Sequence, residues 1–279
     1  MRGKTIVITG ATSGIGEIAA IRLAEQGARI LFTARDEKRG KATFEKLVRA
    51  NDAAEHVMHL GDLSLLSEQK KVARAIAAEP QIDVLINNAG ALFNQRIETS
   101  EGLEKTFALN HMSYFTITNL LLDRLKATPG SRVVSVSSRA HHGAKLDFDD
   151  LQSRRNYRGF AVYSKSKLCN ILFTRALAKR LAGTGMTANC LHPGFVATRF
   201  ADESGGWIQR LVKLAKPLGA ISPEDGAKTI IYLASSRDLG LVSGEYFYQC
   251  KIMAPTAEAQ NDTDAERLWQ ASAKIAAVD

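Results

Sequence analysis

The chain alternates short apolar runs with segments of helical periodicity along almost its whole length. The apolar runs, which are rich in β-branched residues, are KTIVIT, RILFTA, EHVMHL, IDVLINN, SRVVSVSS, MTANCLHPG and GEYFYQ. Continuous apolar strands that are separated by helices favour a parallel sheet covered by helices on both faces. We therefore predict one doubly wound α/β domain with a seven-stranded, mainly parallel sheet flanked by helices.

The segments between these runs predict the covering helices. They are expected at residues 18–27, 36–49, 68–79, 102–126, 158–183, 223–236 and 263–275. Gly27 should end the first of them, because glycine readily adopts the positive φ of a helix C-terminus. We expect residues 1–255 to form the domain. Residues 256–279 are expected to form a helical extension that packs on the domain or on a partner.

Composition excludes several classes of protein. Of 279 residues, 45% are hydrophobic and 24% are charged, which is ordinary for a globular chain with a sizeable core. Apolar runs of membrane-spanning length and a signal peptide are both missing, so we expect a cytoplasmic protein without stable membrane insertion. The formal charge is +8 without a basic run interleaved with aromatics, so no nucleic-acid partner is expected. Cys169, Cys190 and Cys250 read as reduced thiols.

A glycine-rich turn follows the first predicted strand. The sequence TGATSGIG at residues 9–16 places glycines at 10, 14 and 16. Such a turn lets the backbone approach a pyrophosphate and aims the next helix N-terminus at its charge. The spacing is GxxxGxG rather than the GxGxxG of the long dehydrogenases. Its position at the first strand–helix junction predicts a Rossmann-type nucleotide site.

The end of the second strand predicts which dinucleotide is preferred. An acidic residue there would bind a ribose 2′-hydroxyl and select NAD. This chain has Ala34 and then Arg35 at that place, and Asp36 falls later. An arginine can pair with a 2′-phosphate, so NADP(H) is expected to be preferred, with NAD(H) as the alternative. A solvated arginine at a helix start is the structural alternative.

The stretch YSKSK, residues 163–167, contains a tyrosine and two lysines. Each helical residue turns about 100° around the axis, so Lys165 points away from Tyr163. Lys167 lies four positions on, on the same face and about 6 Å away. An ammonium beside the phenol would lower the tyrosine pKa and make Tyr163 a proton donor or acceptor.

Taken together, the motifs carry a resemblance. TGATSGIG, NNAG (residues 87–90), Asn110, VSS ending at Ser138, YSKSK and HPG (residues 192–194) follow one another in this order. The chain resembles a short-chain dehydrogenase/reductase over nearly its whole length. NHMSYFTITNLLL, SRAHHGAKLDFDDLQ and HPGFVATRF make it similar to the retinol dehydrogenase and WW-domain oxidoreductase branch. Vertebrate members usually carry a membrane anchor or an added module before the glycine turn. Neither precedes TGATSGIG in this sequence, so we expect a soluble, bacterial relative.

The resemblance implies roles for four catalytic residues. Tyr163 would be the acid/base, and Lys167 would lower its pKa and bind the nicotinamide ribose. Ser138 would hold the substrate oxygen, and Asn110 would anchor a water that relays protons to Lys167. Ser137 is the neighbour that competes with Ser138, but strand residues alternate faces, so only one of them can point into the site.

The resemblance also implies the cofactor contacts. The pyrophosphate would contact Thr9, Gly10, Ser13, Gly14, Ile15 and Gly16. The adenine would contact Asp62 and Leu63, and the adenosine ribose side would contact Asn88, Ala89 and Gly90. The nicotinamide ribose would contact Tyr163 and Lys167, and the carboxamide would contact Pro193, Gly194, Val196 and Thr198. Some of these have a structural alternative, such as strand caps for Asn87 and Asn88 or a simple turn at HPG.

The substrate is expected to be a small hydrophobic alcohol, aldehyde or ketone. The apolar residues behind this expectation are Leu146, Phe148, Leu151, Trp207, Ile208, Leu211, Val212 and Leu214, in the loop before YSKSK and in the segment after HPG. The same residues could instead form a dimer contact. His141 and His142 read as loop residues near the substrate mouth, and no metal is expected.

Relatives commonly pair their two long helices, so a homodimer or homotetramer through residues 102–126 and 158–183 is expected. Leu120, Leu121, Phe173 and Leu177 would form the contact or the core beneath it.

Two other functions share parts of this pattern. An extended-type sugar epimerase or dehydratase would have a TGxxGxxG turn and a larger C-terminal part. A non-catalytic nucleotide sensor commonly loses the tyrosine or the lysine, and both are present in this chain.

Overall fold

The computed structural model describes residues 1–195 and 221–278. Within these residues one sheet has the strand order β3-β2-β1-β4-β5-β6-β7-β8. The strands are β1 (Thr5–Ile8), β2 (Arg29–Ala34), β3 (Val57–Leu60), β4 (Val84–Asn87), β5 (Arg132–Val136), β6 (Thr187–Leu191), β7 (Tyr246–Tyr248) and β8 (Lys251–Ile252). The first seven pair in parallel, as predicted.

The predicted count of seven strands is wrong by one. Strand β8 pairs antiparallel with β7 at the edge of the sheet. The two strands are joined by Gln249 and Cys250, which both have positive φ, and a two-residue turn of this kind reverses the chain tightly. Neither residue is a usual turn former, so no sequence signal predicts this hairpin.

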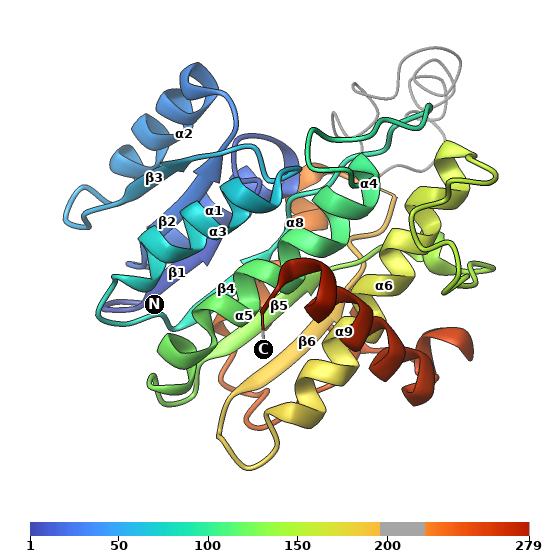
Figure 1. The fold of residues 1–279 in the computed structure, drawn as a ribbon. Coiled ribbons are helices and arrows are strands. Elements are labelled where there is room, and N and C mark those ends of the chain that lie inside the picture. Colours follow the sequence, from blue (N-terminus) through green and yellow to red (C-terminus); the bar gives the residue numbers. More distant parts are fainter. Residues whose placement is uncertain (196–220, 279) are drawn as a thin grey trace.

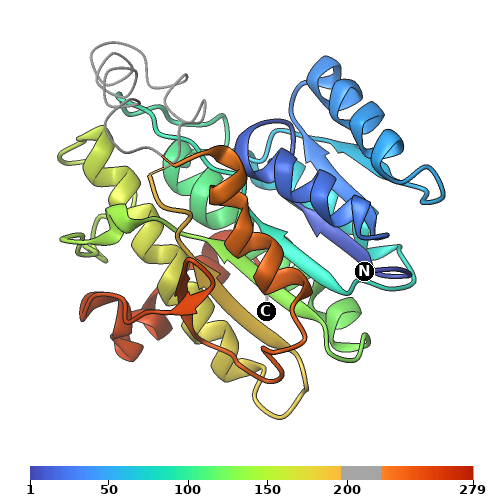
Figure 2. The same cartoon turned by 180° about the vertical axis from the view of Figure 1, so that it is seen from behind.

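Helices cover both faces of the sheet, as Figures 1 and 2 show from opposite sides. One face carries α1 (Gly14–Glu25), α2 (Glu37–Ala50) and α8 (Pro223–Ser235), and the other carries α3 (Leu66–Ala77), α5 (Ser113–Lys126) and α6 (Gly159–Arg180). Gly27, with φ +89°, follows α1, as predicted. Each helical layer encloses its own apolar core against the sheet.

The single helix predicted at residues 102–126 is interrupted. A short helix α4 (Lys105–Phe107) leads into a π-helical turn, Ala108–Met112, and only then into α5. The helical part begins later than predicted because Gly102 has φ +77° and the Glu104 carboxylate caps α4, accepting bonds from the amides of Thr106 and Phe107. The π turn widens the backbone where Asn110 lies.

The C-terminal helix α9 (Asp262–Ala276) lies on α6 and reaches α5 (Figure 1). Its Trp269 ring stacks on Phe173 of α6, with 5.8 Å between ring centroids. Arg180 lies over the same indole, 4.0 Å from the ring centroid, and also pairs with Glu266. Residues of the C-terminal segment therefore contact the sheet-bearing part of the chain. The division at residue 255 stays a prediction.

None of the helices in the described ranges combines the length and the apolar character that crossing a bilayer requires.

Candidate active site

The glycine turn is fastened to the end of strand β4. The Thr9 hydroxyl accepts hydrogen bonds from the amides of Asn88 and Ala89 at 3.0 and 3.1 Å. The Asn88 side chain donates to the carbonyls of Thr9 and Gly10, both at 2.9 Å. Thr9, Asn88 and Ala89 thus hold the turn against the end of β4.

Two glycines of this turn leave no room for a side chain. A Cβ atom on Gly10 would lie 2.7 Å from the Cα of Ala89, and one on Gly16 would lie 2.3 Å from the Asn88 amide nitrogen. Gly10 and Gly14 have φ values of +68° and +60°. Ser13 makes no side-chain capping bond to α1. The first amides of α1 are therefore free of a side-chain cap, which fits a phosphate-binding helix start.

The end of strand β2 presents Arg35 as an exposed side chain. Asp36 beside it is the N-cap of α2, where its carboxylate accepts a 2.8 Å bond from the Arg39 amide. The nearest acid is therefore engaged in capping a helix. After β3, the Asp62 carboxylate accepts a bond from the Ser64 amide, and the Leu63 side chain is buried in the core. Only the backbone of Leu63 can face a cofactor.

Asn110 lies in the π turn, and its side-chain amide is fully engaged. Its oxygen accepts from the Ala91 amide at 2.9 Å, and its nitrogen donates to the Ala91 carbonyl and to the Ser166 hydroxyl. The side chain therefore ties the segment after β4 to α6. A water relay at Asn110 would have to use its backbone carbonyl.

Ser138 and Tyr163 meet near the end of strand β5. The Tyr163 ring is 7% exposed, and burial raises the pKa of its phenol, whereas a hydrogen bond with the Ser138 side chain lowers it. The Ser137 hydroxyl points elsewhere and donates to the Lys167 carbonyl at 2.7 Å. The two serines therefore face different partners, as the alternation of strand residues predicts.

Lys167 is buried one turn beyond Tyr163. Its ammonium nitrogen lies 5.6 Å from the centroid of the Tyr163 ring, in line with the predicted spacing. Burial lowers the pKa of Lys167 to about 7. We expected Lys167 to depress the pKa of Tyr163, but in this structure the pKa of Tyr163 is raised. The expectation is wrong for this structure, because burial is the largest influence on the phenol and the opposing influence is the hydrogen bond with Ser138 rather than Lys167.

The carbonyl of Val136, the last residue of β5, collects three donors. They are the Lys167 ammonium at 3.1 Å, the Asn170 side-chain amide at 3.2 Å and the Tyr114 hydroxyl at 3.3 Å. Sequence reasoning missed Tyr114 and Asn170 as supports for Lys167. Helical spacing could have found both, because Tyr114 lies four residues after Asn110 and Asn170 lies three after Lys167.

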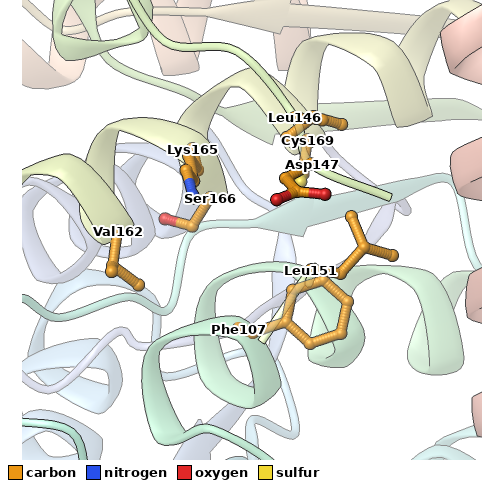
Figure 3. A pocket seen from close by; sticks show the side chains of 8 residues that line it. All are labelled: Phe107, Leu146, Asp147, Leu151, Val162, Lys165, Ser166 and Cys169. Carbon is orange, nitrogen blue, oxygen red and sulfur yellow. The ribbon is translucent and has the colours of Figure 1, made fainter. Parts of the chain in front are cut away.

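Lys165 does not share this environment. It lines a small cavity of about 10 Å³ together with the Asp147 carboxylate and Leu151, as Figure 3 shows. This cavity is too small for a substrate. Leu146 and Leu151 line it and Phe148 lies under Arg267, so these three apolar residues pack against the protein itself.

The HPG turn follows strand β6. Gly194 has φ +88°, and a Cβ on it would lie 2.7 Å from Ile221. The His192 ring stacks on Tyr248 with 4.1 Å between centroids, and its Nδ1 accepts a bond from the Gly194 amide at 3.2 Å. Pro193 lies between them. The remaining residues predicted for this region lie outside the described residues: Val196, Thr198, Trp207, Ile208, Leu211, Val212 and Leu214.

His141 and His142 differ from each other in their surroundings. His141 is buried, with Nδ1 against the Ser138 carbonyl and its ring edge-on to Tyr246, and only His142 is exposed. Burial lowers the pKa of His141. The His141 ring thus packs against Tyr246 of β7, and its place relative to the substrate stays a prediction.

The described site can hold a nucleotide and move a proton. A Cβ on Gly90 would lie 3.2 Å from the Asn110 side-chain oxygen and 3.3 Å from the Lys167 nitrogen, so glycine at this position lets both side chains approach the backbone closely. The glycine turn, the segment after β4 and the pair of Tyr163 and Ser138 all follow the carboxyl ends of parallel strands. This edge is where open α/β sheets bind their ligands.

Comparisons with known proteins find relatives of one kind. Residues 4–209 match the family described as short chain dehydrogenase. Retinol dehydrogenase 13 of Homo sapiens is 40% identical over 98% of this chain and 84% of its own length, and retinol dehydrogenase 12 of Homo sapiens is 40% identical over 98% and 86%. Among solved structures, an uncharacterized protein from Mycobacterium paratuberculosis aligns with a TM-score of 0.80 and 30% identity, covering 100% of this chain and 95% of that one. The Pseudomonas aeruginosa RhlG/NADP active-site complex aligns with a TM-score of 0.69 and 26% identity, covering 88% and 94%.

Proposed function

The chain belongs to the short chain dehydrogenase family, in its retinol dehydrogenase branch, and from this premise we propose that it transfers hydride between NADP(H) and an apolar alcohol, aldehyde or ketone. Membership makes it an NAD(P)-dependent alcohol or carbonyl oxidoreductase. The proposal adds the cofactor preference, the apolar substrate class and Tyr163 as the acid/base.

The observation that carries the proposal is the buried hydroxyl pair of Tyr163 and Ser138 beside Lys167. Because burial raises the pKa of Tyr163, the phenol is protonated at neutral pH and can donate to a carbonyl oxygen. The Ser138 hydroxyl orients the same oxygen. Lys167, with its pKa lowered to about 7, can return a proton to Tyr163 at neutral pH.

A bound nicotinamide dinucleotide supplies or accepts the hydride. The glycine turn between Gly10 and Gly16 would hold its pyrophosphate, Asp62 its adenine side, and Pro193 and Gly194 its carboxamide end. Its nicotinamide ribose would lie beside Tyr163 and Lys167. These assignments rest on the match between the residues of this chain and the family motifs.

NADP(H) is preferred in this proposal because of the end of strand β2. Arg35 is exposed there, while Asp36 is bonded to the Arg39 amide and would need to leave its helix cap to bind a ribose. The NADP complex of Pseudomonas aeruginosa RhlG supports the same preference.

An apolar substrate is proposed from two observations. Phe160 lies one turn before Tyr163 on α6, with 6.5 Å between their ring centroids, and it is 59% exposed. An exposed phenylalanine beside the acid/base suits an apolar molecule that covers it. The relatives named retinol dehydrogenase support the same class.

Assembly as a homodimer or homotetramer and a cytoplasmic location also belong to the proposal. Leu121, Phe173 and Leu177 lie in the core, and α9 covers Phe173, so pairing through α6 would have to use the surface that α9 leaves open. Light scattering on the purified chain tests the assembly.

Replacing the acid/base tests the proposed chemistry. In Tyr163→Phe, kcat for NADPH-dependent reduction of a panel of apolar aldehydes and ketones should fall ~10²–10⁴-fold, because the ring stays and the proton donor is lost. NADPH binding, followed by fluorescence titration, should be unchanged. Tyr232→Phe on helix α8 is the matched control and should leave both quantities as in wild type.

A kcat in Tyr163→Phe within a fewfold of wild type would refute the assignment. Wild-type protein that binds NADPH and reduces no member of the panel would favour the nucleotide-sensing alternative.

A further inference from the structure

We propose that Ser272 of the C-terminal helix α9 is a positioning residue for the oxidoreductase reaction, acting through His111 on the π-helical turn that carries Asn110. The proposal rests on the function proposed above. It gives α9 a part in the chemistry, although none of the family motifs lies in residues 262–276.

The link begins at a buried histidine. The His111 ring has no exposed surface and is surrounded by the rings of Phe107, Phe115 and Phe173, at centroid distances of 5.2, 6.4 and 6.4 Å. Its Nε2 lies 2.8 Å from the Ser272 hydroxyl, which comes from a helix 161 residues further along the chain. This is the hydrogen bond that connects the π turn to α9.

The Ser272 hydroxyl determines which of the two groups donates in this hydrogen bond. The single hydroxyl proton of Ser272 goes to the Leu268 carbonyl, one turn earlier in α9, at 2.7 Å. The hydroxyl oxygen can therefore only accept from His111, and Nε2 of the imidazole carries the proton. Burial lowers the pKa of His111 to about 3, so the ring stays neutral. Its Nδ1 has no hydrogen-bond partner among the described residues, which leaves Ser272 as the polar contact that fixes the ring.

Asn110 connects the π turn to Tyr163, the proposed acid/base, through Ser166. Asn110, the residue before His111, donates to the Ser166 hydroxyl at 3.0 Å. Ser166 in turn donates to the backbone carbonyl of Tyr163 at 2.7 Å. The two neighbours in the turn thus tie it to different helices, His111 to α9 and Asn110 to the first turns of α6.

Helix α9 is itself held firmly enough to serve as an anchor. Its Asp262 pairs with Arg175 and Lys179 of α6 at 3.0 and 2.8 Å, and Trp269 stacks between Phe173 and the Arg180 guanidinium. Loss of the Ser272 hydroxyl would leave α9 docked by these contacts while its bond to the π turn is gone. A change in activity would then report the bond rather than the helix.

Ser272→Ala tests the link in the full-length chain. We expect kcat for NADPH-dependent carbonyl reduction to fall about tenfold, since small misplacements of catalytic groups cost that much or more. KM for the carbonyl and Kd for NADPH should stay within about twofold, because neither binding surface is touched. Hydrogen exchange of the amides in residues 105–116 should accelerate. Ser235→Ala is the matched control: this serine also donates to the carbonyl four residues earlier, on α8, and its loss should change none of these values.

A double variant separates positioning from stability. His111→Phe/Ser272→Ala removes the buried Nε2–H that Ser272→Ala alone leaves unpaired, and it keeps an aromatic ring among Phe107, Phe115 and Phe173. The thermal midpoint of unfolding of the double variant should therefore equal that of wild type. If kcat stays low, the bond positions the turn; if kcat recovers with the midpoint, the proposal is overturned. The double variant also decides the matter if Ser272→Ala does not fold.

Ser272→Thr, which keeps the hydroxyl, should retain kcat. A wild-type kcat in Ser272→Ala, while Tyr163→Phe is inactive, overturns this inference and leaves the proposed function intact. An active Tyr163→Phe contradicts the proposed function instead.

Discussion

At the scale of single residues, burial sets the protonation of the two groups on which the proposed chemistry depends. It raises the pKa of Tyr163 and lowers that of Lys167 to about 7. Both shifts favour the neutral forms. The phenol is thereby kept as a proton donor, and the ammonium is brought to a pKa at which it can exchange protons near neutral pH.

The lowered pKa of Lys167 predicts a pH dependence of stability. An unfolded lysine keeps its proton up to about pH 10.5, whereas folded Lys167 loses it near pH 7. Between these values the unfolded chain binds more protons, so this residue makes the free energy of unfolding rise with pH, by up to ~1.4 kcal/mol per unit. Below pH 7 both states are protonated and the contribution is flat.

Urea unfolding of wild type and Lys167→Met without cofactor measures this slope. The difference in unfolding free energy, wild type minus variant, should grow as the pH is raised above about 7. Lys165→Met is the matched control, because Lys165 is only partly buried, and it should show no such growth. Equal slopes for both variants would contradict the assignment of Lys167 as the buried lysine of the pair.

The sequence predicted the positions of most site residues but not their partners. The 100° helical turn separated Lys167 from Lys165, and strand alternation separated Ser138 from Ser137. The raised pKa of Tyr163 was not predictable, because it depends on how completely residues far along the chain cover the ring. For the same reason the burial of His141 against Tyr246 was missed.

At the scale of elements, the position of α9 over α6 is the feature that local patterns left undecided. Apolar spacing predicted a helix at residues 263–275, but it did not say whether the apolar side meets this chain or a partner. The complementary charges of α6 and α9 decide it in the structure, with Arg175 and Arg180 opposite Asp262 and Glu266. The π turn was equally unpredictable, since an inserted residue leaves the apolar periodicity nearly unchanged.

Trp269 should be the residue by which α9 stabilises the fold. Trp269→Ala removes the indole between Phe173 and Arg180, and the unfolding free energy should fall by about 3 kcal/mol, the lower end for a large aromatic side chain. Lys274→Ala on the exposed side of α9 should change it by less than about 0.5 kcal/mol. Chemical denaturation of both variants makes the comparison, and equal losses would mean that α9 contributes little through its packed face.

At the scale of the whole molecule, cofactor binding should be visible as thermal stabilisation. A ligand present at about 100 times its Kd stabilises the folded state by ~2.7 kcal/mol, which for a chain of this size raises the midpoint by roughly 5–10 °C. At equal concentrations NADPH should raise the midpoint more than NADH does. Arg35→Ala should remove most of that difference by weakening NADPH binding ~10–150-fold and leaving NADH almost unchanged.

Thermal scans of wild type and Arg35→Ala with each cofactor measure this preference, and Arg49→Ala at the far end of α2 controls for the loss of a positive charge. Two outcomes would contradict the proposed preference for NADP(H): a larger midpoint shift with NADH in wild type, or an equal loss of affinity for both cofactors in Arg35→Ala.

The hydrogen bonds that fasten the glycine turn to the end of β4 have a consequence for the order in which a growing chain acquires its parts. Thr9 and Asn88 are 79 residues apart, and the four strands β3-β2-β1-β4 are neighbours in the sheet, so this half can close once residues up to Asn87 and Asn88 have left the ribosome. His111 has to wait for Ser272, 161 residues later. A nascent chain can therefore assemble its nucleotide cradle early in synthesis, whereas the turn that carries Asn110 receives its last support only when the C-terminal helix has been made.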